Sequence, residues 1–121
     1  MLSRDDMQGL LDRMAAAYSV GDAAACANMF TDNAQLHSPF APPAIGRAAL
    51  LSLHEDWTSE GGDKRFIILD FGCSHRLAWC LCRFSEGDVT GDGTSLIVLE
   101  RGADDVWLIR SCCLHGDAEL T

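Results

Sequence analysis

The residues best placed for chemistry lie on a predicted strand near the end of the chain. Side chains alternate between the two faces of a strand, so Trp107 and Ile109 are in step with Ser111, Cys113 and His115. A histidine with its ordinary pKa near 6.5 can transfer protons at neutral pH. We therefore predict that His115 is a catalytic proton-transfer group facing a pocket, with Ser111 orienting a carbonyl or hydroxyl group. The alternative is a partly exposed strand-end histidine bonded to a backbone carbonyl.

Two further histidines lie among apolar residues. His37 adjoins Ser38, but strand alternation places the two on opposite faces, which argues against a Ser–His pair. His54 shares a helical face with Leu50 and Trp57, so it is predicted to line the same cavity. The alternative for His54 is a hydrogen-bonded histidine at the boundary of the core.

The six cysteines lack the spacing of a zinc site or of a disulfide framework. Cys80 and Cys82 share one strand face, whereas Cys112 and Cys113 point to opposite faces. The strand at residues 94–101 is predicted to lie between the two groups. That separates them by about 9–10 Å, which is too far for a disulfide. We predict buried, reduced thiols, with no metal and no cofactor.

Length and charge narrow the possible partners. The chain has 121 residues, typical of one domain, and we treat residues 1–121 as such. It is 48% hydrophobic and 22% charged, with a net charge of −9 and a single lysine. Such a field repels phosphate backbones and anionic lipid, so neither nucleic acid nor a membrane is an expected partner. The first residues contain no apolar signal segment, and the predicted location is cytoplasmic.

The first half of the chain predicts three helices. Ser3 is placed to cap the first, with Asp6 at the capping-box position. Gly21 ends it, Asp22 begins a short second helix, and a third spans residues 47–58. The first helix should bury a stripe of five side chains, namely Met7, Leu10, Leu11, Met14 and Tyr18.

The second half predicts four antiparallel strands. A short strand at residues 34–38 precedes them, after a turn at residues 30–33, and the prolines that follow stop it. A loop at residues 102–105 joins the last two strands as a hairpin. Helices and strands are segregated along the chain, which predicts an α+β fold with three N-terminal helices on the concave face of a curved antiparallel sheet. The four strands are predicted at residues 65–71, 76–84, 94–101 and 106–116.

Three of these strands contain uninterrupted apolar runs, at residues 66–69, 96–99 and 107–109. A strand of a sheet that has one solvent-exposed face should instead alternate apolar and polar residues. Three helices can cover only one face, so the other face needs a different cover. We predict a homodimer in which two copies pack through their outer sheet faces.

Five short motifs resemble the SnoaL-like branch of the nuclear-transport-factor-2-like (cystatin-like α+β) superfamily. They are Tyr18-Ser19-Val20-Gly21-Asp22, Phe30-Thr31-Asp32-Asn33-Ala34, Ser38-Pro39, Gly46-Arg47-Ala48-Ala49-Leu50 and Trp107-x-Ile109. The resemblance covers essentially the whole chain. It implies a cone-shaped fold, an apolar pocket between the helices and the concave sheet face, and a dimer. Activities in this superfamily include steroid isomerisation, polyketide cyclisation, epoxide hydrolysis and dehydration.

The chain departs from the steroid-isomerase members of this superfamily at their acid and base positions. In those members a carboxylate base precedes the proline of the first strand, where this chain has Ser38. The phenol position corresponds to Met14, one turn before Tyr18, and the second acid falls among Ile97 and Val98. The resemblance therefore does not imply that proton-transfer chemistry. Many SnoaL-like members carry His or Asp on the last strand, facing the pocket.

Two functions fit these residues. The first is a small-molecule-binding protein acting as a cofactor-free isomerase, cyclase, hydrolase or dehydratase, with His115 moving the proton and a small apolar or carbonyl-containing ligand. The second is a non-catalytic ligand-binding or dimerisation module. An open, polar cavity would favour the first, and a cone filled by side chains would favour the second. The predicted pocket residues are Met14, Tyr18, Ser38, Phe40, His54, Trp57, Ser111 and Cys113.

Overall fold

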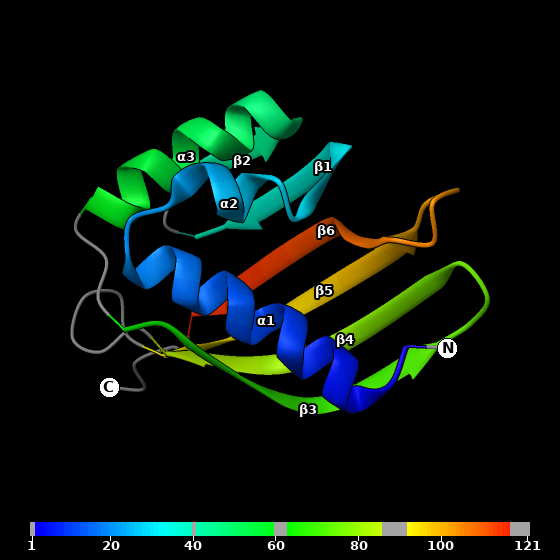
Figure 1. Cartoon of the computed structure of the whole chain (residues 1–121). Coiled ribbons are helices and arrows are strands. Elements are labelled where there is room, and N and C mark those ends of the chain that lie inside the picture. Colours follow the sequence, from blue (N-terminus) through cyan, green and yellow to red (C-terminus); the bar gives the residue numbers. More distant parts are fainter. Residues whose placement is uncertain (1, 40, 60–62, 86–91, 117–121) are drawn as a thin grey trace.

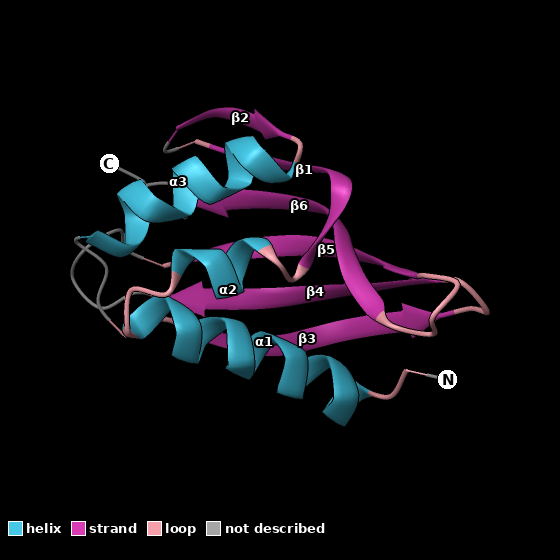
Figure 2. Cartoon of the chain, turned by 45° about the horizontal axis from the view of Figure 1, so that its top comes forward, coloured by secondary structure: helices cyan, strands magenta, loops and turns pink. Residues whose placement is uncertain are grey.

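The computed structural model describes residues 2–39, 41–59, 63–85 and 92–116. Its three helices all lie on one side of a curved sheet, and the third follows the first two strands in the chain (Figures 1 and 2). The sheet has six strands in the order β2-β1-β6-β5-β4-β3. In chain order the elements are α1 (Arg4–Ser19), α2 (Ala23–Ala27), β1 (Phe30–Ser38), β2 (Ala41–Ile45), α3 (Arg47–Ser59), β3 (Arg65–Cys73), β4 (Leu77–Ser85), β5 (Gly93–Arg101) and β6 (Trp107–Gly116).

Local signals set the start of α1 as predicted. The Ser3 hydroxyl accepts a hydrogen bond from the backbone N–H of Asp6 at 3.1 Å, and the Asp6 carboxylate accepts one from the Ser3 N–H at 3.0 Å. This reciprocal capping box satisfies two backbone donors that the helix itself leaves unpaired. The predicted stripe of five side chains is buried, so α1 packs its apolar face onto the sheet.

The other two helices also begin at capping positions. The Asp22 carboxylate accepts from the Ala25 N–H at 3.1 Å and starts α2, which lies between α1 and α3 (Figure 2). Gly46, with φ +88°, turns the chain from β2 into α3 in a conformation that glycine adopts without strain. The Arg47 guanidinium then holds β1, through the Asp32 carboxylate at 2.7 Å and the Phe30 carbonyl at 2.7 Å.

The first strand is longer than predicted, and the predicted turn at residues 30–33 is wrong. Those residues open β1, which pairs in parallel with β6 from Phe30 opposite Ile109 onward. Backbone bonding across this pair, including Ile109 N–H to the Met29 carbonyl at 2.8 Å, holds the segment extended. A parallel partner some 80 residues away leaves no periodic signal in the local sequence. The predicted antiparallel sheet is therefore mixed.

Pro42 and Pro43 lie inside a strand that the sequence did not predict. They belong to β2, which forms one edge of the sheet and pairs only with β1. Proline lacks an N–H, but on an edge strand that missing donor can face outward without breaking a ladder. Pro42 and Pro43 therefore lie within an edge strand and do not end the sheet.

The pairing of β5 with β6 contains one extra residue. Leu99 pairs with Ile109, whereas its neighbour Val98 pairs with Ser111, so Arg110 has no partner opposite it on β5. The Arg110 guanidinium donates to a carbonyl of β1 at 3.0 Å. One extra residue reverses the face to which all later side chains of the strand point.

The alternation predicted for β6 is therefore wrong beyond this bulge. Cys112 is buried on the concave face and Leu114 packs against the same core. The residues between and after them, Ser111, Cys113 and His115, occupy the outer face, and the side chains of Cys113 and His115 are exposed. The residues that the sequence placed in the pocket thus lie on its far side.

Among the described residues, no helix has both the length and the apolar character needed to cross a membrane. The core instead fills the space between the three helices and the concave face of the sheet. The order of the strands confirms that β5 separates Cys80 and Cys82 from Cys112. All six cysteines are free thiols.

Candidate functional site

A small enclosed cavity lies between the helices and the concave face of the sheet. Its volume is about 20 Å³, which is room for about one water molecule. Apolar side chains form most of its wall, and four side chains with polar atoms interrupt that wall: His54, Lys64, Ser95 and Cys112. The apolar lining comes from all layers of the fold and consists of Met14, Phe30, Leu36, Trp57, Phe66, Ile97, Ile109 and Leu114.

His54 is the one imidazole in this wall. Its side chain is 3% exposed and packs between the rings of Phe30 and Trp57, with centroids 5.7 and 5.8 Å away. Its Nδ1 lies 2.7 Å from the Leu50 carbonyl oxygen, an acceptor, so Nδ1 carries the proton. That tautomer leaves Nε2 as a hydrogen-bond acceptor, and Nε2 bonds to no side chain or backbone group in the described part of the chain.

Burial lowers the pKa of His54, and the positive charge of Lys64 lowers it further, although the bond to Leu50 acts in the opposite direction. His54 is therefore neutral at physiological pH. A neutral imidazole with a fixed tautomer can accept a proton or a hydrogen bond through Nε2. The arrangement supplies the acid–base group that the sequence analysis assigned to His115.

We expect this burial to make folding pH-dependent. Above about pH 6.5 His54 is neutral in both states, whereas below it the unfolded chain binds a proton that the folded chain does not yet bind. As the pH is lowered from about 6.5 to the lowered pKa of His54, the free energy of unfolding should decrease by up to about 1.4 kcal/mol per pH unit. Urea denaturation of the wild type and of His54→Gln across this range measures the difference.

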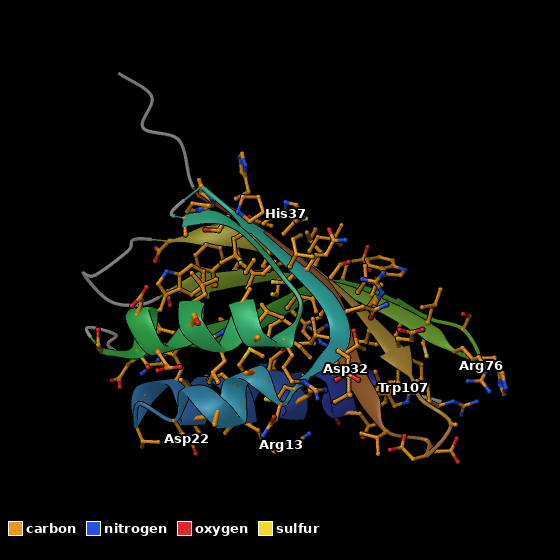
Figure 3. The ribbon with its side chains drawn as sticks, turned by 90° about the horizontal axis from the view of Figure 1, so that it is seen from above. Arg13, Asp22, Asp32, His37, Arg76 and Trp107 are labelled. Atoms are coloured by element: carbon orange, nitrogen blue, oxygen red, sulfur yellow. The ribbon has the colours of Figure 1, made fainter. Side chains whose placement is uncertain are left out.

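His37→Gln is the matched control for this measurement. His37 is exposed and lies on the side of the sheet away from the helices (Figure 3), so its replacement should leave the wild-type slope in place. Only His54→Gln should flatten the slope. Equal slopes in all three proteins would contradict the assignment of a buried, neutral His54.

Lys64 closes the same cavity from the segment that precedes β3. It is the only lysine of the chain and is half-buried. Its Nζ lies over three aromatic rings, 4.5 Å from the centroid of Tyr18 and 5.5 Å from those of Trp57 and Phe66. Each such contact contributes about 0.5–1 kcal/mol at a partly exposed site. The three rings help to hold the ammonium at the cavity.

The buried thiols of Cys82 and Cys112 are not reactive groups. The Cys112 Sγ lies 3.4 Å from the Ser95 hydroxyl, and the Cys82 thiol donates to the Ser95 carbonyl at 3.6 Å. Burial raises the pKa of Cys112 to about 11, and a hydrogen bond to Cys80 together with burial raises the pKa of Cys82. Nucleophilic thiols need a lowered pKa and access to solvent. Within the described residues, no group of three or more His, Cys, Asp or Glu is placed to hold a metal ion.

The structure brings together part of the predicted pocket. Met14, His54 and Trp57 line the cavity. Tyr18 is buried beside it and donates its hydroxyl to the Trp57 carbonyl at 3.1 Å, which joins the ends of α1 and α3. Phe40 lies outside the described residues.

The remaining predicted residues do not line the cavity. Ser38 ends β1 and lies beyond Phe30 and Leu36, the two residues of that strand that line the cavity. Ser111, Cys113 and His115 face outward because of the bulge described above. The proposed role of His115 in a pocket therefore does not follow from the fold.

Several lining residues were missed by the sequence analysis. Ser95 and Ile97 alternate with exposed residues on β5, and this period of two was a usable signal for the inward face. Cys112 and Leu114 carried no such signal because the bulge precedes them. Lys64 gave no periodic signal, because it lies in the segment between α3 and β3 and not in a helix or strand.

The acid and base positions of the steroid-isomerase members can now be located. Met14, which the resemblance places at the phenol position, lines the cavity, as does Ile97, whereas Val98, the other residue considered for the second acid, and Ser38 do not. In the described part of the chain no carboxylate lines the cavity. The chemistry available here is thus that of a neutral imidazole, one ammonium and one hydroxyl in an apolar enclosure.

The helices and curved sheet define the α+β class known as the cystatin-like or NTF2-like fold. A domain of unknown function with a cystatin-like fold from Nostoc punctiforme superposes with a TM-score of 0.82 at 16% identity, covering 96% of this chain and 78% of that one. An NTF-2 like protein of unknown function from Shewanella oneidensis has a TM-score of 0.75 at 21% identity, covering 93% and 98%. These neighbours confirm the predicted resemblance at the level of the fold.

A third solved structure carries a functional description. A ketosteroid isomerase-like protein from Erwinia carotovora atroseptica has a TM-score of 0.73 at 20% identity, covering 88% of this chain and 89% of that one. The sequence matches no family model and no curated protein. Similarity at this level establishes the fold, and the function has to be argued from the residues of this chain.

Proposed function

We propose that this protein binds a small apolar molecule in the cavity between its helices and the concave face of its sheet. The observation that carries the proposal is His54, an imidazole buried in an apolar wall with Nε2 directed to no partner in the described chain. Because Nδ1 is bonded to the Leu50 carbonyl, the other ring nitrogen can accept a hydrogen bond, which favours a ligand that donates one at the cavity. A ligand with a hydroxyl or enol group meets that requirement.

His54 replaces His115 as the proton-transfer group of this proposal. A neutral imidazole can act as a general base toward a group that lies within hydrogen-bond distance of Nε2. Lys64 lines the same cavity, so its positive charge would favour negative charge that develops on the ligand. The reaction class would be a cofactor-free proton transfer, as in an isomerase, cyclase or dehydratase.

The size of the cavity favours a second candidate, a non-catalytic module. About 20 Å³ accommodates no substrate unless side chains move, so the closed form is a nearly filled cone. Ligand binding therefore requires side chains of the wall to move. If the cavity never opens, the protein is a non-catalytic structural module.

A ligand titration distinguishes these candidates. Neutral apolar fragments with a hydroxyl group, such as phenol and 2-naphthol, should shift backbone amide NMR signals of Met14, His54 and Leu114. Leu114→Phe, which adds bulk to the wall, should weaken binding at least tenfold. Val20→Phe adds a comparable ring at an exposed site on the end of α1 and should bind like the wild type.

Two results would contradict the proposal. One is the absence of any saturable shift at these residues, which would leave the non-catalytic module. The other is equal weakening by Leu114→Phe and Val20→Phe, which would place the fragments elsewhere. Circular dichroism of both variants controls for loss of folding.

The apolar outer face supports the further proposal that the protein acts as a homodimer. Its exposed side chains include Ile67, Leu77, Trp79 and Leu96, and a shallow groove of about 580 Å³ follows Leu77, Trp79, Leu96 and Val98. Trp79 lies flat across Gly72, where a Cβ would collide with its indole. Contiguous exposed apolar surface of this kind is typical of protein interfaces.

Charge favours a second copy as the occupant of this face. Arg83 lies at one end of the outer face, opposite Thr94, and Glu100 lies at the other end, opposite Leu77. A two-fold axis across the strands brings the Arg83 end of each copy over the Glu100 end of its partner. A two-fold interface is self-complementary in this way, with each contact occurring twice.

A further inference from the structure

The cavity has room for one water molecule and has polar side chains in both layers of its wall. Its volume of about 20 Å³ exceeds the roughly 10–15 Å³ that a single water requires. His54 contributes from α3, on the helical side, and Ser95 contributes from β5, on the sheet side. A buried water is held by two to four polar atoms, and these two side chains meet the lower limit.

The imidazole of His54 offers an acceptor. Its Nδ1–H donates to the Leu50 carbonyl of the same helix at 2.7 Å, so Nε2 lies on the ring edge that faces away from that carbonyl. Burial lowers the pKa of His54, and Nε2 therefore carries no proton at neutral pH. A group that binds here through Nε2 has to donate a hydrogen bond.

The hydroxyl of Ser95 offers a donor. The residue is 1% exposed, and its Oγ lies 3.4 Å from the Cys112 Sγ. Burial raises the pKa of Cys112 to about 11, so this group is a protonated thiol whose S–H can donate to Oγ. The Ser95 O–H can then donate to a second acceptor, and an oxygen atom is a stronger acceptor than sulfur.

We propose that one water molecule occupies the cavity, where it donates to His54 Nε2 and accepts from the Ser95 hydroxyl, and that the hydroxyl group of the ligand replaces this water. The first part stands on the cavity alone, whereas the second rests on the proposed ligand-binding function. Hydrogen bonds then run without a break from the thiol of Cys112 through Ser95, the bound oxygen and His54 to the backbone of α3. Every donor in this chain has an acceptor.

The two contacts define the polar group that the ligand must carry. A hydroxyl both donates and accepts, so it reproduces both hydrogen bonds of the water. A ketone or an ether accepts but cannot donate to Nε2, and a methyl group does neither. Displacing an ordered water with a group that lacks its hydrogen bonds loses affinity. The ligand class is therefore phenols and alcohols, with Ser95 as a residue that determines specificity.

A crystal structure of the protein without added ligand tests the first part. An ordered water should lie within about 3.2 Å of both His54 Nε2 and Ser95 Oγ. Ser111→Ala is the matched control, because it removes the same hydroxyl from the outer face of β6, and it should keep this water. The absence of a water between His54 and Ser95 in the wild type would overturn this part.

Titrations with phenol and toluene, followed by NMR, test the second part, because the two compounds match in size and differ in the hydroxyl group. The wild type and Ser111→Ala should both bind phenol at least about tenfold more tightly than toluene. Ser95→Ala should reduce this preference about fivefold and leave toluene binding unchanged. A merely structural effect of Ser95→Ala would instead weaken both compounds equally, and circular dichroism checks that both variants fold.

Three outcomes would count against the second part. Equal binding of phenol and toluene by the wild type would overturn the replacement of a water and leave the ligand cavity standing. The same preference in Ser95→Ala as in Ser111→Ala would overturn the role of Ser95. If toluene, phenol and 2-naphthol all fail to bind, the proposed function itself fails, and the crystal structure still decides whether the water is present.

Discussion

Phe30→Ala should lower the free energy of unfolding by about 3–5 kcal/mol. The Phe30 side chain is 1% exposed and contacts the imidazole of His54, so its removal takes away buried surface and leaves a void. The residue also joins three elements: it opens β1, pairs with Ile109 of β6 and offers its carbonyl to Arg47 of α3. These backbone contacts persist in the variant, so the loss is one of packing.

Urea denaturation followed by circular dichroism measures this difference, at one fixed protein concentration so that association contributes equally. Phe71→Ala is the matched control: it deletes the same ring at a site that is 38% exposed, and it should cost markedly less. A loss for Phe30→Ala no larger than that for Phe71→Ala would show that the cone is loosely packed. That outcome would contradict the nearly filled cavity.

Trp79→Glu should raise the dissociation constant of the homodimer at least about a hundredfold, because large aromatic residues dominate interface energies. The Trp79 side chain is 39% exposed at the middle of the apolar outer face. In the proposed homodimer a two-fold axis would place two copies of every changed residue in one interface, so the substitution would introduce two buried carboxylates. Neither carboxylate would be paired with a cation in the interface, and an unpaired buried charge is strongly unfavourable.

Sedimentation velocity over a series of concentrations measures this effect, with Leu77→Glu as a second variant in the same face. Val106→Glu is the control, because it replaces an apolar side chain of similar exposure, 48%, in the β5–β6 loop. It should leave the dimer intact. A wild type that stays monomeric from micromolar to millimolar concentration would contradict the dimer itself.

The two apolar faces of the sheet explain why its strands looked uniformly apolar. The concave face carries residues such as Ile68 and Ile97 against the helices, while the outer face carries Ile67 and Leu96 beside them in sequence. The continuous runs therefore correctly indicated two apolar faces. What covers the second face is a proposal that the sedimentation experiment tests.

The predicted helices agree with the structure because their signals are local. A cap such as Ser3 with Asp6, or a breaker such as Gly21, acts on the backbone within a few residues, so its effect is readable without knowing the fold. The four C-terminal strands were readable for a similar reason, since each pairs with its neighbour in the chain. These elements also gave the α+β class and the position of the core.

The site was predicted only in part, because its residues depend on register. Met14, His54 and Trp57 were found because a helix keeps its period along its length. His115 and Ser111 were misplaced because a single extra residue, Arg110, reverses the faces of a strand, and nothing in the local sequence marks it. Lys64 joins the site only because α1, α3 and β3 converge around it.

By itself, the amino-acid sequence determined the three helices, the C-terminal strands and an apolar core between them. Their caps, periods and turns act over a few residues, so the chain carries them in readable form. Only the tertiary structure decided the parallel pairing of β1 with β6, the bulge at Arg110 and the meeting of His54 with Lys64 at one cavity. Each of these brings together residues distant in the chain, and their contacts exist only once the whole sheet has formed.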